Sequence, residues 1–218
     1  MMNTDAPVSQ NAAGRIILFT ILLCVAYAIM RYHIVGPVDW KDFPFFILNK
    51  GISLAALVLL TLNFSLGPLN NIGLPVPASW LSARKSLGMT GFLLALIHAL
   101  MSFMLFTPDI YPKLFEADGG LTLFGGLSML GGVLSFVVLW GYNLSFQTHL
   151  RDEKTFIQFI TSRNFLLFAM LLSAAHLFFM GFKGWLAPAG WHGGLPPISL
   201  VAFVIFAVGY VANLFGRK

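Results

Sequence analysis

Six long apolar stretches dominate this sequence, and they restrict the possible folds more than any other feature. Each has about the 20 apolar residues that an α-helix needs to cross a hydrocarbon core about 30 Å thick. Hydrophobic residues make up 58% of the 218 residues and charged residues only 10%, a balance typical of membrane proteins. We therefore expect an all-α polytopic membrane protein, a six-transmembrane-helix bundle in the lipid bilayer. The predicted spans are Ile16–Ile34, Phe45–Ser65, Leu87–Phe106, Leu121–Leu144, Phe165–Phe182 and Ile198–Phe215.

The connections between the spans are short, so the sequence predicts one membrane domain over 15–218 after a polar N-terminus over 1–14. The stretch Leu66–Trp80 is rich in Pro, Gly and Asn and predicts a loop. The segment 145–163 is polar and could include a short surface helix. No glycine fingerprint for a dinucleotide is present, so a nicotinamide cofactor would have to act through a separate protein.

Basic residues are distributed unevenly between the two predicted sides of the membrane. With a cytoplasmic N-terminus, eight Lys and Arg residues fall inside and five outside, which favours both termini inside. The net charge of +5 therefore reflects membrane topology and predicts no nucleic-acid partner. Together with the compact chain, this basic cytoplasmic side suits an integral protein of a bacterial inner membrane. The five outside residues are Arg31, Lys41, Lys50, Lys113 and Lys183.

Two of the five histidines, His98 and His176, lie well inside apolar spans. An ionisable side chain within a membrane indicates a functional site, because burying an unpartnered polar group in hydrocarbon is costly. His98 follows Lys85 by 98 − 85 = 13 residues, and His176 follows Arg163 by 176 − 163 = 13 residues. Since the third and fifth spans run in the same direction, we expect both imidazoles at one depth. Two histidines at one depth on separate helices are what a bis-histidine haem iron requires.

Small residues share the helical faces of both histidines. Ala95 and Gly91 precede His98 by one and two turns, and Ser173 and Ala169 precede His176 in the same way. Such strips would give a porphyrin room between helices, but they also serve plain helix packing in membranes.

Other site types fit these residues less well. A zinc or non-haem iron site needs further ligands, and no Asp or Glu lies inside any predicted span. The main alternative is a cofactor-free transporter or structural subunit that uses His98 and His176 for packing or proton relay. A hydrolase is a weaker alternative, since Ser102 and Ser173 share faces with the histidines but resemble packing serines.

Three short motifs resemble the ferric reductase-like transmembrane family. They are ARKSLGMTGFLLALIHAL at 83–100, NFSLGPL at the exit of the second span, and AAHLFF in the fifth span. Within that family the chain is most similar to the MsrQ-type haem-binding membrane subunits. The resemblance implies a six-helix bundle in which His98 and His176 hold haem b as axial ligands. It also implies an oxidoreductase role, with electrons passing from a cytoplasmic donor to an acceptor at the outer face.

The sequence departs from family members that contain two haems. Those members carry second histidines about four turns along both ligand-bearing spans, where this chain has Pro112 and Arg163. We therefore expect one haem per chain, an arrangement similar to the membrane domains of STEAP-type metalloreductases.

A single haem nearer the outer face would leave room on the cytoplasmic side. Arg84, Lys85 and Arg163 could bind a flavin (FMN or FAD) or a quinone there, although each could equally be a topological anchor. The expected donor is a cytoplasmic flavin reductase or a quinol, and the expected acceptor is a partner reductase or a ferric chelate. Lys183 could pair with a haem propionate or simply extend toward water at a helix end.

Overall fold

The chain folds into a bundle of long α-helices, as the computed structural model shows for residues 6–150 and 152–216. Six of its helical segments are long and apolar enough to cross a membrane, which confirms the predicted fold class. The described part contains no β-strand, only one isolated bridge between Phe115 and Leu121. The long helices are α1 Ala6–Ile29, α2 Leu48–Asn71, α3 Ala78–Leu105, α4 Leu123–Leu144, α6 Arg163–Trp185 and α7 Ile198–Gly216, and the short helix α5 spans Lys154–Ile160.

Two of the long helices continue into tighter or wider turns at one end. A π-helical turn, Met30–Ile34, extends α1, and another, Phe43–Ile47, leads into α2 after the 3-10 turn Trp40–Asp42. Further 3-10 turns occupy connections, at Pro112–Leu114, Thr148–Leu150, Pro188–Gly190 and His192–Gly194. The predicted surface helix between the fourth and fifth spans is confirmed as α5.

The predicted loop Leu66–Trp80 is wrong over most of its length. The α2 helix continues through Pro68 to Asn71, and α3 already begins at Ala78. Pro68 is tolerated because it lies in the last turn, where few intrahelical hydrogen bonds remain to be lost. The Asn71 side chain also donates to the carbonyl of Gly216, which ties the end of α2 to the end of α7.

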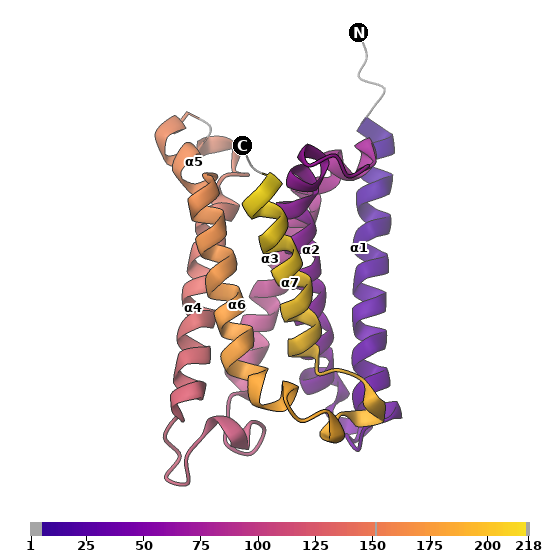
Figure 1. Cartoon of the computed structure of the whole chain (residues 1–218), viewed down its shortest axis with the longest axis vertical. Helices are drawn as coiled ribbons and strands as arrows, with labels where there is room; N and C mark the ends of the chain where they lie inside the picture. The colour runs from indigo at the N-terminus through magenta and orange to yellow at the C-terminus, as the bar shows by residue number, and fades with distance from the viewer. Residues whose placement is uncertain (1–5, 151, 217–218) are drawn as a thin grey trace.

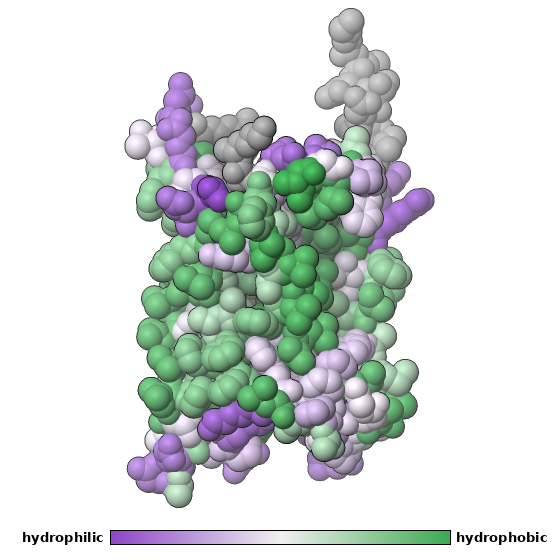
Figure 2. Space-filling view, viewed as in Figure 1, coloured by the Kyte–Doolittle hydropathy of each residue, from purple (hydrophilic) through white to green (hydrophobic). Residues whose placement is uncertain are grey.

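The two ends of the bundle are defined here by their basic residues. The arginine end carries Arg84 and Arg163, and the lysine end carries Lys50, Lys113 and Lys183. The beginning of α1 and the end of α7 both lie at the arginine end, at the top of Figure 1. Figure 2 shows hydrophilic residues concentrated at the two ends and an apolar band between them. Large apolar side chains such as Phe19 and Val208 point outward within this band, as expected of a surface that meets lipid.

The α2 helix is the centre of the packing. It contacts α1, α3 and α7, while α4 and α6 form a second tightly packed pair that joins α7. The largest buried cluster combines Phe64 of α2, Tyr142 of α4, Met170 of α6 and Phe206 of α7. The helices that carry the half-buried His98 and His176, α3 and α6, are not packed against each other along their length. The space between them is therefore bordered by α2 on one side and α4 on the other.

Candidate functional site

His98 lies near the lysine end of α3 and bonds to the beginning of α2. Its Nδ1 is 2.7 Å from Oδ1 of Asn49, a residue that is only 1% exposed. The Asn49 amide in turn donates to the hydroxyl of Ser102, one turn beyond His98, over 3.0 Å. Asn49 therefore bridges two residues of α3 and fixes the orientation of the imidazole.

His176 on α6 is held by α4 in a similar way. Its Nδ1 is 2.8 Å from the backbone carbonyl oxygen of Ser128, and the Ser128 hydroxyl lies 3.3 Å from the same nitrogen. That hydroxyl also donates to the carbonyl of His176 over 3.3 Å. Ser128 itself is 1% exposed, so the contact is made inside the bundle.

These bonds determine which ring nitrogen carries the proton. A serine hydroxyl lies 3.3 Å from each Nδ1, but the nearest oxygens, an amide oxygen at His98 and a backbone carbonyl at His176, accept hydrogen bonds and cannot donate them. Each neutral imidazole must therefore carry its proton on Nδ1, which leaves the Nε2 lone pair available. Among the described residues, no hydrogen-bond partner reaches Nε2 of either histidine. An Nδ1–H donated to an oxygen with a free Nε2 is the arrangement found in metal-ligating histidines.

The two imidazoles also lie at the same level of the bundle. Phe92 of α3 and Phe136 of α4 stack with ring centroids 5.6 Å apart and mark a common level. At 1.5 Å per residue, His98 lies about 9 Å from that level toward the lysine end. Gly132 and Ser128, which both contact His176 from α4, lie about 6 and 12 Å from it in the same direction. The histidines are thus level within about one helical turn.

The glycine pair Gly131 and Gly132 brings α4 against His176. A Cβ at Gly131 would lie 3.1 Å from the backbone nitrogen of His176. A Cβ at Gly132 would lie 2.8 Å from Nδ1 and 3.1 Å from Cε1 of the imidazole. The two helices therefore approach closely here, and the imidazole lies where any larger residue would place its side chain.

The small residues predicted beside the histidines mostly serve helix packing. Gly91 is buried against α2, where an added Cβ would lie 3.2 Å from the carbonyl oxygen of Ala56. Ala169 is fully buried, and the Ser173 hydroxyl bonds to both the Ala169 carbonyl and the Ser135 hydroxyl of α4. Ala95 is only half-buried. Of the two roles considered for these strips, packing is the one that the contacts of Gly91, Ala169 and Ser173 serve.

A cavity of about 520 Å³ opens at the arginine end, within the range of small-molecule sites. Arg84 and Arg163 both line it, so the structure brings two of the three predicted basic residues together. Lys85 is exposed and is not among the lining residues. The other lining residues are Gly67, Pro68, Asn71, Tyr142, Thr161 and Leu166.

Both arginines are anchored by backbone oxygens and not by acids. Arg84 Nε donates to the Asn63 carbonyl over 3.0 Å, and Arg163 donates to the Leu214 carbonyl over 2.6 Å. Within 6–150 and 152–216, the ion pair that the structure shows is Lys41 with Asp39, at the opposite end. Among the described residues, the guanidinium groups lining the cavity therefore have no carboxylate partner, which makes the cavity suitable for an anionic group.

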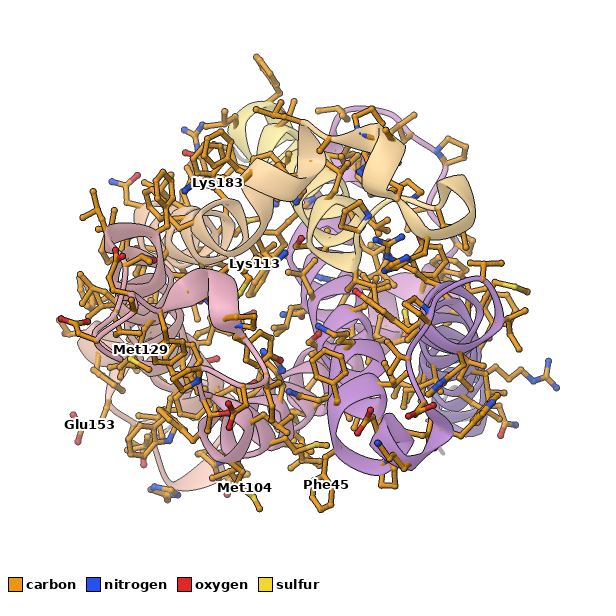
Figure 3. The ribbon with its side chains drawn as sticks, turned by 90° about the horizontal axis from the view of Figure 1, so that it is seen from below. Phe45, Met104, Lys113, Met129, Glu153 and Lys183 are labelled. Carbon is orange, nitrogen blue, oxygen red and sulfur yellow. The ribbon has the colours of Figure 1, made fainter. Side chains whose placement is uncertain are left out.

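A second cavity, of about 740 Å³, lies at the lysine end beside the start of α2 and the end of α3. Its lining includes three acids, Asp39, Asp42 and Asp109, together with apolar side chains such as Phe45 and Met104. Phe45 and Met104 lie near each other at the rim of the bundle in Figure 3. The two cavities thus open at opposite ends of the bundle.

The remaining histidines lie elsewhere. His33 stacks on Trp40 with ring centroids 4.2 Å apart, His149 is exposed in a connection, and His192 contacts Tyr32. The Ser102 hydroxyl accepts from Asn49 and lies 3.3 Å from Nδ1 of His98, so it belongs to the network around that imidazole. Ser173 bonds to Ala169 and Ser135 and contributes to packing. Lys183 is exposed, with its ammonium 4.7 Å from the ring centroid of Phe124.

The residues present fit a bis-histidine haem. No three His, Cys, Asp or Glu side chains of the described residues gather into a metal-binding group. The candidate set is instead two imidazole nitrogens with fixed tautomers, at one level and on helices that are not packed against each other. Haem supplies the other four iron ligands itself, so it is the iron centre that needs only these two.

Sequence analysis did not identify Asn49 or Ser128. Their only sequence signal was an uncharged polar residue within an apolar span, which also fits ordinary helix packing. No protein-family model matches the chain, and a search of curated proteins finds no significant relative.

Proposed function

We propose that the chain binds one haem b through Nε2 of His98 and Nε2 of His176 and passes electrons from one side of a membrane to the other. The observation that carries this proposal is the shared geometry of the two imidazoles. Each donates from Nδ1 to an oxygen of the neighbouring helix, and each keeps an unbonded Nε2 at the same level. The resemblance to ferric reductase-like proteins points to the same chemistry.

The protein's contribution is to hold and orient the two ligands. Asn49 and Ser128 fix the imidazole planes and raise the basicity of Nε2 through the bonds at Nδ1. The two histidines would hold the iron of the haem and leave no site open to oxygen, which favours electron transfer over oxygen activation. When bound, the haem accepts and gives up one electron at a time, and its potential is set by these ligands and by burial.

Electrons would enter at the arginine end and leave at the lysine end. The cavity beside Arg84 and Arg163 suits a flavin (FMN or FAD) or a quinone, because two unpaired guanidinium groups attract a phosphate or an anionic ring. A cytoplasmic flavin reductase or a quinol would then be the donor. The acceptor at the lysine end would be a partner reductase or a ferric chelate. The basic arginine end and the family resemblance favour a bacterial inner membrane with cytoplasmic termini.

The experiment is a reduced-minus-oxidised absorption spectrum of the detergent-purified protein with a pyridine haemochrome assay. We expect low-spin b-type bands and one haem per chain, with the bands lost in both His98→Ala and His176→Ala. The matched control is His149→Ala, which removes an exposed histidine and should leave the spectrum unchanged. A colourless wild-type protein from haem-replete cells would overturn the proposal and favour a cofactor-free transporter or structural subunit.

A further inference from the structure

Lys50 is a cation within the membrane-spanning part of α2 and directly follows Asn49, the residue that holds His98. Its ammonium lies over three aromatic rings, 4.3 Å from the ring centroid of Phe46, 5.2 Å from that of Tyr32 and 5.4 Å from that of Tyr111. Such contacts stabilise a cation but satisfy none of its three N–H donors.

Within 6–150 and 152–216, Lys50 forms no ion pair with an acid. The charges that act on it most strongly, those of Lys113 and Arg31, are both positive. Tyr111 supplies no anion, because burial raises the pKa of its hydroxyl to about 12. Arg31 is itself only 5% exposed, donates to the Leu195 carbonyl and leaves its Nε without an acceptor. Lys50 therefore experiences two like charges and has no ion pair to an acid among the described residues.

Lys113 is exposed, but Arg31 is buried and Lys50 is half-buried, and a cation removed from water is costly unless an anion accompanies it. Lys113 lies toward the middle of the ring of helices when the molecule is viewed from the lysine end, whereas Phe45 and Met104 lie at its rim (Figure 3). Lys183 interacts with the ring of Phe124 and belongs to a different helix pair. An anion that complemented Lys50 would therefore lie beside Asn49, the residue that holds His98.

We propose that Lys50, assisted by Lys113, binds the propionate carboxylates of the haem held by His98 and His176, and so orients the haem with its propionate edge toward the lysine end. This inference rests on the proposed function. Haem carries its two carboxylates on one edge, and the backbone step from Asn49 to Lys50 places a carboxylate-binding cation beside an axial ligand. Lys50 and Lys113, and not Lys183, then form the propionate site.

The test compares two porphyrins that differ only in these carboxylates. Apo-protein from haem-depleted cells is titrated with ferric protoporphyrin IX and with its dimethyl ester, which has the same ring but no charge. We expect the wild type to bind the free acid at least about tenfold more tightly than the ester, the order expected for a charge-assisted hydrogen bond. Lys50→Gln should lose most of this preference, and Lys50→Arg should retain it.

The matched control is Lys41→Gln, which removes an exposed lysine of the same end that pairs with Asp39 at 3.3 Å. It should keep the wild-type preference. As a second measurement, the midpoint potential of the reconstituted protein should fall in Lys50→Gln, because a nearby cation favours the reduced iron.

The outcomes separate the two proposals. A wild type that binds the free acid and the ester equally well overturns the propionate site but does not contradict His98 and His176 as haem ligands. This comparison uses the wild type alone, so it does not depend on whether a variant folds. Retention of the preference in both Lys50→Gln and Lys113→Gln also overturns it. A wild type that binds neither porphyrin overturns the proposed function itself.

Discussion

At the scale of single residues, the site depends on oxygen atoms that neighbouring helices present to the histidines. The oxygen at His176 comes from the backbone of Ser128 and is available whatever side chain occupies that position. The oxygen at His98 belongs to the Asn49 side chain, so one substitution can remove it. The two proposed ligands, His98 and His176, therefore differ in how directly mutation can test their support.

Asn49→Leu should weaken haem binding while leaving both ligand histidines in place. The substitution removes the acceptor of Nδ1–H and frees the imidazole to rotate, and loss of such a partner typically costs about 10- to 100-fold in metal affinity. Titration of the apo-protein with ferric haem measures the change. Asn70→Leu, at an exposed position near the other end of α2, is the control and should bind as the wild type does. Equal affinity in Asn49→Leu and the wild type would show that Asn49 does not support the ligand.

Arg84→Gln should reduce binding of an anionic cofactor at the arginine end, whereas Lys85→Gln should not. The two residues are adjacent in sequence, but only Arg84 lines the cavity. Loss of one charge-assisted hydrogen bond lowers affinity about tenfold or more. Quenching of FMN fluorescence, and competition by a short-chain quinone, measure binding in detergent. Equal losses in both variants would indicate a diffuse effect of basic charge and not a bound cofactor.

At the scale of the helices, the approach of α4 to α6 determines how much room the His176 imidazole has. Gly132→Ala places a methyl group 2.8 Å from Nδ1, so the ring must move or the helices must separate. Overpacking of this kind costs about 1–3 kcal/mol, and we expect haem content to fall together with thermal stability.

Gly126→Ala is the matched control for this change. It lies on the same helix, and an added Cβ would meet nothing within 4 Å. Haem content and melting temperature should therefore match the wild type. If Gly132→Ala also retained full haem content, the imidazole would not be confined by α4, and the packing argument for His176 would fail.

The sequence predicted the helices well because membrane spans follow directly from runs of apolar residues. Leu66–Trp80 was the exception, since Pro68 and the asparagines around it suggested a loop where the last turn of α2 forms. His98 and His176 could be identified because an ionisable residue in an apolar span is conspicuous. Asn49 and Ser128 could not, because their roles depend on which side chain of one helix faces which residue of another. Lys50 was assigned only to topology, since sequence gives no indication of the three rings around it.

At the scale of the whole molecule, the direction of electron flow depends on which end of the bundle faces the cytoplasm. Eight basic residues belong to the predicted inner side and five to the outer side, and three of those five, Arg31, Lys50 and Lys113, form the cluster beside His98. If that cluster exists to bind an anion, it contributes little to topology. The difference between the two sides is then larger than the simple count suggests, and the arginine end should be cytoplasmic.

Labelling of single cysteines in intact cells tests this orientation. Glu116→Cys and Glu153→Cys replace exposed acids at the lysine end and the arginine end, so neither variant changes the basic residues that determine topology. The native Cys24 is buried and should stay unlabelled, and Cys24→Ala gives a clean background. A membrane-impermeant maleimide should label position 116 in whole cells but position 153 only after lysis. The reverse pattern would place the arginine cavity outside the cytoplasm and exclude a cytoplasmic flavin reductase as its donor.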